Sequence, residues 1–195
     1  MKLFKALSAV LIISFLLACT KNEPTRLTNI SGLIPDLEFE LTDENNQAVT
    51  AKDYLGSTVA IFFGFTSCPD VCPTTMHQFA SIIKKIEGAE KAIKVLFISV
   101  DPKRDTAEKL KKYTDTLGAA FIGLRGDDSL IKEMTKRYRV TFGYGDEDAQ
   151  GHYDVSHSGA MFIFDTQGKA RLLVTQGSLS EDIAIDLKNL IESEL

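Results

Sequence analysis

The chain has 195 residues, a length typical of one domain. Its composition is 44% hydrophobic and 25% charged, which predicts a packed core and excludes a globally disordered chain. The formal net charge is −5 and no basic run stands out, so the composition argues against nucleic-acid binding.

The first 18 residues have the pattern of a secretory signal peptide. Lys2 and Lys5 precede a short apolar run, 6–17, and a small residue then precedes Cys19. The ending Leu-Leu-Ala-Cys resembles a bacterial lipobox, which implies cleavage before Cys19 and a lipid on its thiol. A plain signal peptide and an uncleaved anchor are the alternatives, although the run is shorter than the roughly 20 residues of a spanning helix.

These features predict three parts of the chain. Residues 1–18 are expected to be removed as a signal peptide, and the polar segment 19–30 to be a lipid-anchored tether. Residues 31–195 are expected to form one domain. The predicted location is the bacterial cell envelope, with a membrane-anchored lipoprotein whose domain lies in the periplasm or otherwise outside the cytoplasmic membrane.

Strands and helices alternate along the predicted domain. Runs rich in β-branched and aromatic residues, or with alternating polarity, predict strands over 37–41, 48–50, 59–65, 94–100, 121–124, 160–164 and 170–174. Helical apolar spacing predicts helices over 74–87, 105–117, 127–138 and 180–195. Asp127 or Asp128 is the expected N-cap of the third of these helices, and Ser180 that of the last. Segment 143–158 is rich in Gly, Asp and His, lacks periodicity, and is expected to be a long functional loop.

This order of elements indicates an α/β fold. Early β-α-β units followed by an antiparallel hairpin and a final helix match a thioredoxin-like sheet. The hairpin expected near the N-terminus and the long loop before the last hairpin are additions to that sheet.

Two cysteines stand between the apolar strand 59–65 and the helix that follows it. Cys68 and Cys72 are four residues apart, so in a helical turn they share one face. The helix N-terminus favours thiolate over thiol. In an oxidising compartment the pair is expected to form a disulfide unless it is kept reduced, and so small a loop gains little structural stability from one. A functional pair is therefore favoured, for electron transfer or for binding a soft metal.

The histidines offer a third ligand. His157 ends the long loop just before strand 160–164, which starts beside the cysteine loop in a thioredoxin-like sheet. His77 lies on the first helix and is expected to point away from the thiols, and His152 is expected to be solvated. Two thiolates and an imidazole suit copper, because thiolates favour Cu(I) and imidazole helps to hold Cu(II). Three ligands leave the tetrahedron of zinc, the alternative metal, incomplete.

Three segments, in this order, resemble motifs of the Sco/SenC family. They are FGFTSCPDVCPTTM at 63–76, DPKRDT at 101–106 and YDVSHS at 153–158. The resemblance covers about residues 30–195. The position before the first cysteine is often His in the family and is Ser67 here, which removes an auxiliary polar group but no ligand. The lipobox also departs from the family's common transmembrane anchor.

The resemblance implies a membrane-tethered, thioredoxin-like copper metallochaperone for cytochrome c oxidase assembly. Cys68, Cys72 and His157 are its implied copper ligands, for Cu(I) and Cu(II). The implied partners are the copper-bearing subunit of the oxidase, whose dinuclear centre receives the metal, and other copper chaperones or thiol reductants. No enzymatic activity is expected beyond reduction of the target's cysteines by the same thiols.

Two acids near these positions are candidate supporting residues. Asp70 lies between the cysteines and is expected to raise the thiol pKa values without metal and to favour a bound cation. Asp154 is expected to accept a hydrogen bond from His157 and orient it. The alternative for each is a solvated loop acid.

The main alternative function is that of a metal-independent periplasmic thiol–disulfide oxidoreductase. Most such proteins have two residues between their cysteines, and a cis-proline before the facing strand where this chain has Ser158 and Gly159. A peroxiredoxin-like peroxidase is a further alternative, but 156–164 lacks the arginine such a site needs. A structural or adhesion module is disfavoured because it has no need of two exposed thiols.

Overall fold

The computed structural model describes residues 24–150 and 152–194. The expected signal peptide, 1–18, and the expected lipidation site, Cys19, lie outside the described residues. Within the described ranges no helix is both long enough and apolar enough to cross a membrane.

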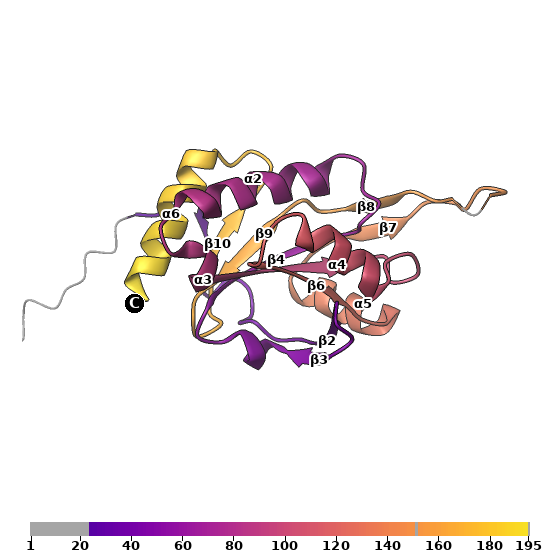
Figure 1. Cartoon of the computed structure of the whole chain (residues 1–195), viewed down its shortest axis with the longest axis horizontal. Helices are drawn as coiled ribbons and strands as arrows, with labels where there is room; N and C mark the ends of the chain where they lie inside the picture. Colours follow the sequence, from indigo (N-terminus) through magenta and orange to yellow (C-terminus); the bar gives the residue numbers. More distant parts are fainter. Residues whose placement is uncertain (1–23, 151, 195) are drawn as a thin grey trace, which may run out of the picture.

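One mixed sheet of eight strands runs through the domain (Figure 1). Its order is β1-β10-β9-β4-β5-β6-β2-β3, in which β4, β5 and β6 are parallel and the other pairs antiparallel. The bounds are β1 (Thr28–Asn29), β2 (Glu40–Asp43), β3 (Ala48–Thr50), β4 (Thr58–Gly64), β5 (Ile93–Ser99), β6 (Phe121–Arg125), β9 (Met161–Phe164) and β10 (Ala170–Val174). A separate ribbon pairs β7 (Phe142–Tyr144) with β8 (Val155–His157).

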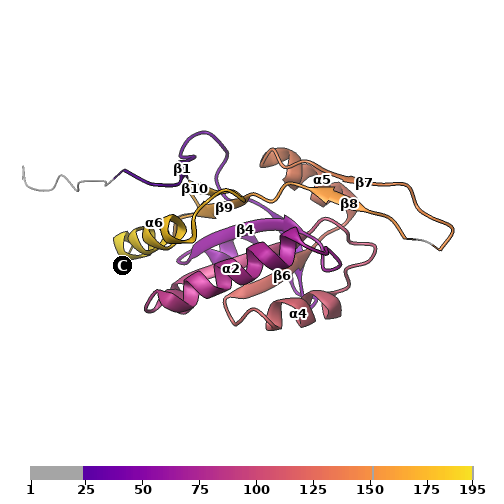
Figure 2. The same ribbon diagram turned by 90° about the horizontal axis from the view of Figure 1, so that it is seen from above.

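Helices cover both faces of the sheet (Figure 2). Their bounds are η1 (Ala51–Tyr54), α2 (Val71–Lys85), α3 (Ala89–Ala92), α4 (Ala107–Asp115), α5 (Asp128–Arg137) and α6 (Ser180–Ser193). Helices α2, α4 and α6 pack on one face and α5 and η1 on the other. Successive residues of β4 alternate between the two cores, with Phe62 among the first set and Ile61 and Phe63 among the second. The whole of β4 is buried, as expected for a central strand.

The thioredoxin-like α/β class predicted from the sequence is confirmed, and so is the N-cap of α5. The Asp127 side chain accepts hydrogen bonds from the N–H groups of Ser129 and Leu130. The prediction for α6 was wrong, because Ser180 is its first helical residue and the N-cap is Leu179. Helix α3 was not predicted, since four residues are too few to show a helical period.

Two further segments differ from expectation. The segment 143–158 is not an irregular loop along its length, because its two ends pair as β7 and β8. Strand β1 lies within the expected tether, 19–30, and pairs with β10. Leu27 and Ile30 are also buried, so part of that segment is packed on the domain.

Candidate metal centre

Both cysteines lie where β4 turns into α2. The N–H of Cys68 donates to the carbonyl oxygen of Phe65 at 3.1 Å. Helix α2 begins at Val71, three residues earlier than predicted, and Pro73 is accommodated within its first turn. Cys72 is thus helical, and its N–H points at the Cys68 sulfur, 3.4 Å away. Cys72 is buried and Cys68 half-buried, so the junction presents one thiol near solvent and holds the other in the core.

Gly64, the last residue of β4, leaves room for the Cys72 thiol. A Cβ atom at this position would lie 2.7 Å from Sγ of Cys72. It would also lie 2.9 Å from ring carbons of Phe62 and Phe97. Real Cβ atoms do not approach so closely, so glycine is what allows the thiol to lie against the strand.

A buried carboxylate, Asp105, holds the loop that leads to Cys68. It accepts hydrogen bonds from the N–H of Thr66 at 3.0 Å and from its hydroxyl at 2.6 Å. The hydroxyl of Ser99 donates to it at 2.7 Å. The parallel pairing of β4 and β5 sets Gly64 beside Ser99, so both loops leave the same sheet edge. This role could not be predicted from the sequence, because the contact depends on strand pairing and has no local signal.

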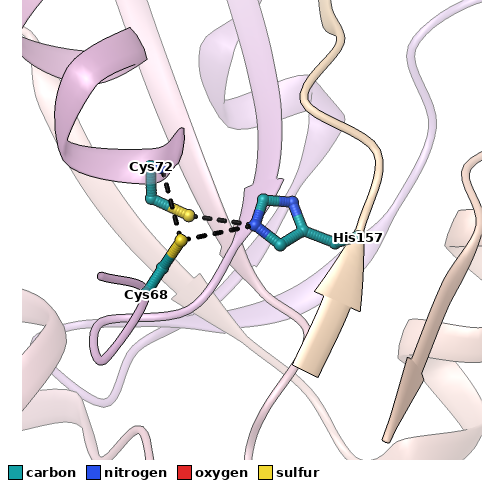
Figure 3. A group of neighbouring side chains, drawn as sticks. All are labelled: Cys68, Cys72 and His157. Carbon is teal, nitrogen blue, oxygen red and sulfur yellow. Dashed lines mark hydrogen bonds between the residues drawn. The ribbon is translucent and has the colours of Figure 1, made fainter. Parts of the chain in front are cut away.

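The third potential ligand comes from a segment far along the chain from the cysteines. His157 is the last residue of β8, and its Nε2 atom lies 3.2 Å from Sγ of Cys72 and 3.7 Å from Sγ of Cys68 (Figure 3). The three potential ligand atoms all lie within 4.8 Å of one another. The structure thus brings together the three residues whose side chains the sequence singled out.

The imidazole is held by its other nitrogen and by two aromatic rings. Nδ1 lies 3.1 Å from the carbonyl oxygen of Ser158, which can only accept, so Nδ1 carries the hydrogen. The lone pair is then on Nε2 and faces the sulfurs. The rings of Phe62 and Phe65 meet the imidazole nearly at right angles, with centroids 5.9 and 5.7 Å away. Nε2 is therefore pre-oriented toward the two sulfurs.

The pKa of the Cys72 thiol differs from the sequence-based expectation. Burial is the largest of the effects that raise the pKa of the Cys72 thiol above its ordinary value, and Cys68 and Asp105 raise it further. The helix N-terminus therefore does not by itself make Cys72 a thiolate in the metal-free protein. A metal ion, whose binding displaces the thiol proton, would supply the missing stabilisation.

The remaining candidate residues lie outside the cluster. His77 is exposed on α2, and His152 is exposed with its Nδ1 3.3 Å from the Asp148 carboxylate, both as expected. Asp70 is the exposed N-cap residue of α2 and accepts from the Thr74 hydroxyl at 3.3 Å. The predicted role of Asp154 was wrong: its side chain is exposed, and the acceptor for His157 is the Ser158 carbonyl.

The donor set fits a thiophilic ion of low coordination number. It combines two sulfurs and one imidazole nitrogen, which suits Cu(I) through the thiolates and Cu(II) with the added nitrogen. A structural zinc site would need a fourth protein ligand, and within the described residues the group has three.

Comparisons with known proteins identify relatives of this chain. The SCO1/SenC family model matches residues 32–192. An SCO2-like protein of Rickettsia conorii is 37% identical over 134 residues, which cover 68% of this chain and 65% of that protein. The human mitochondrial SCO1 homolog is 34% identical over 151 residues, 76% of this chain and 50% of that protein. The chain thus spans between half and two thirds of these relatives.

A solved structure extends the likeness to three dimensions. The copper-bound structure of ScoI from Bradyrhizobium japonicum superposes with a TM-score of 0.72 at 33% identity. The match covers 80% of this chain and 98% of that one.

Proposed function

The chain belongs to the SCO1/SenC family, and we propose that it is a copper metallochaperone whose cargo is held by Cys68, Cys72 and His157. The observation that carries the proposal is the convergence of two sulfurs and one lone-pair nitrogen within 4.8 Å. The copper-bound ScoI relative supports the choice of metal.

The recipient proposed for the copper is the dinuclear centre in the copper-bearing subunit of cytochrome c oxidase. Family membership supports this partner, and the site has the openness that transfer needs. Cys68 is half-buried rather than enclosed, so a donor or acceptor ligand can reach the metal from that side. Other copper chaperones or thiol reductants are the proposed suppliers of copper and electrons.

A second activity is favoured by the proximity of the two cysteines. Their sulfurs lie within 4.8 Å of each other, so the reduced pair can reduce a disulfide in the target before it is loaded. In that exchange the target gains two electrons and two protons, and Cys68 and Cys72 become a disulfide. A metal-independent thiol–disulfide oxidoreductase would use this reaction alone.

Metal titration of the purified, reduced protein tests the proposal. We expect one copper ion per chain for both Cu(I), measured against a competing chelator, and Cu(II), measured by absorption and electron paramagnetic resonance. Cys68→Ser and Cys72→Ser should each weaken both. Copper should then move to the purified oxidase subunit on mixing. A parent protein that reduces disulfides but holds no copper at one equivalent would support the oxidoreductase instead.

We also propose that the mature chain is a lipoprotein of the bacterial cell envelope. The Leu-Leu-Ala-Cys ending before residue 20 supports a lipid on Cys19 after removal of 1–18. Mass spectrometry of the native N-terminus should find a lipidated Cys19. An N-terminus that still begins at Met1 would contradict the anchor without bearing on the metal site.

A further inference from the structure

The ribbon that carries His157 is attached to the domain at its base. Strands β7 and β8 and the turn between them extend from the body as a long arm (Figure 2). The described tip residues are largely exposed. At the base, the hydroxyl of Tyr144 donates to the carbonyl oxygen of Val100 at 2.6 Å. The position of His157 relative to the sulfurs therefore depends on how this base is held.

A single arginine joins the arm to the cysteine loop. The guanidinium carbon of Arg104 lies 3.9 Å from the ring centroid of Tyr153, on the arm, and 5.6 Å from that of Phe65. Its Nη1 also donates to the carbonyl oxygen of Tyr153 at 3.0 Å. Phe65 in turn meets the His157 imidazole edge-on. Arg104 thus contacts the loop before Cys68 and the strand segment before His157.

A buried carboxylate fixes that arginine. Asp101, only 1% exposed, accepts from Nε of Arg104 and, at 2.7 Å, from the hydroxyl of Tyr153. The Asp101 carboxylate therefore accepts hydrogen bonds from both Arg104 and Tyr153, whose side chains stack on each other. A planar guanidinium can stack and donate in two directions at once, which a lysine ammonium cannot do. The neighbouring Lys103 also reaches the arm, through an ion pair with Glu147 at 3.3 Å, but this pair is exposed and its Nζ lies farther from the Tyr153 ring, at 5.5 Å.

We propose that Arg104 is a positioning residue for His157: with Asp101 and Tyr153 it clamps the β7–β8 arm to the cysteine loop and thereby sets the nitrogen donor against the two sulfurs. The proposal rests on the copper function above and adds a consequence to it. Loosening the clamp removes the nitrogen without touching either thiol, so the protein should keep Cu(I) and lose Cu(II).

The test uses Arg104→Lys in the purified full chain. Lysine keeps the positive charge but lacks the planar guanidinium that stacks on Tyr153 and donates to two acceptors. We expect Cu(II) affinity to fall by about 10- to 100-fold, the usual effect of losing a residue that orients a ligand. Cu(I) affinity should change by less than about threefold, and nitrogen coupling in the Cu(II) resonance spectrum should weaken. Tyr153→Phe, which removes only the hydroxyl bond to Asp101, should act in the same direction. Lys112→Ala, at an exposed position of α4, is the control and should leave both affinities unchanged.

Hydrogen exchange on the metal-free protein tests the clamp independently of copper. Amides of β7 and β8 should exchange faster in Arg104→Lys than in the parent or in Lys112→Ala, while those of β4 and β5 stay unchanged. The proposal would be overturned if Arg104→Lys and Tyr153→Phe both kept the parent's exchange rates and the parent's ratio of Cu(II) to Cu(I) affinity. Equal loss of the two affinities would also overturn it. If the parent binds no copper, the exchange measurement still decides whether the clamp exists.

Discussion

Nε2 of His157 lies 3.2 Å from Sγ of Cys72, although 85 positions separate the two residues in the chain. The cysteine is part of a buried helix turn, and the histidine ends a short strand of an arm outside the main sheet. The placement of the cysteines therefore depends on the packed core, whereas the placement of His157 depends on a few side-chain contacts.

Replacing His157 by Ala should affect the two oxidation states of copper differently. Cu(I) keeps both thiolates, whereas Cu(II) loses its only nitrogen donor within the described site. We expect Cu(II) affinity to fall by more than about 100-fold, beyond the effect of losing a partner that only orients a ligand. Competition titrations and loss of nitrogen coupling in the resonance spectrum measure this. His77→Ala, on an exposed position of α2, is the control. Unchanged Cu(II) affinity in His157→Ala would remove it from the ligand set.

Gly64→Ala should displace the Cys72 thiol. The new methyl group would lie 2.7 Å from that sulfur and 2.9 Å from the rings of Phe62 and Phe97. We expect a loss of about 1–3 kcal/mol in the free energy of unfolding, the usual cost of overpacking, together with weaker copper binding. Gly143→Ala is a matched control, because its Cβ would meet only the Ser156 hydroxyl, at 3.5 Å. Equal stability of the two variants in denaturant titrations would contradict this account.

The buried Cys72 thiol should make the metal-free, reduced protein less stable at alkaline pH. Its pKa is raised by burial above the ordinary value of 9.0, so the folded state holds this proton more tightly than the unfolded chain does. The resulting stability is fully present below pH 9 and is lost as pH rises above it. Between pH 9 and 10 the free energy of unfolding should fall faster in the parent than in Cys72→Ala, by up to about 1.4 kcal/mol per pH unit. If the free energies of unfolding of the parent and of Cys72→Ala changed with pH in parallel, burial would not be holding the proton on this thiol.

Oxidation should join the two thiols in a disulfide and prevent metal binding. Cys68 and Cys72 are free and four residues apart, within reach of a disulfide after small adjustments. The count of reactive thiols in the described domain should fall by two on oxidation, and the oxidised protein should no longer hold Cu(I). Reduction should restore both. Two thiols that persist under oxidant would show that the pair is held apart.

The sequence predicts the three candidate ligands, but it does not predict the contacts that hold His157 beside the cysteines. Apolar periodicity marks β4 and α2, and the spacing of Cys68 and Cys72 follows from the turn between them. The ribbon of β7 and β8 escapes prediction because each strand has three residues, too few for an alternating pattern. The roles of Asp105 and Arg104 escape because their partners Thr66 and Tyr153 lie far from them in the sequence.

The unequal burial of the two cysteines has a consequence for the order of transfer. Cys72 is closed in by α2 and β4, while Cys68 and the His157 ring border the solvent side. On the proposed function, an incoming ligand from an acceptor would approach from that side and replace Cys68 or His157 first. The bond to Cys72 would be the last to break on delivery and the first to form on loading. Copper should therefore leave a Cys72→Ser variant faster than a Cys68→Ser variant in single-turnover transfer, and the opposite order of rates would contradict this direction.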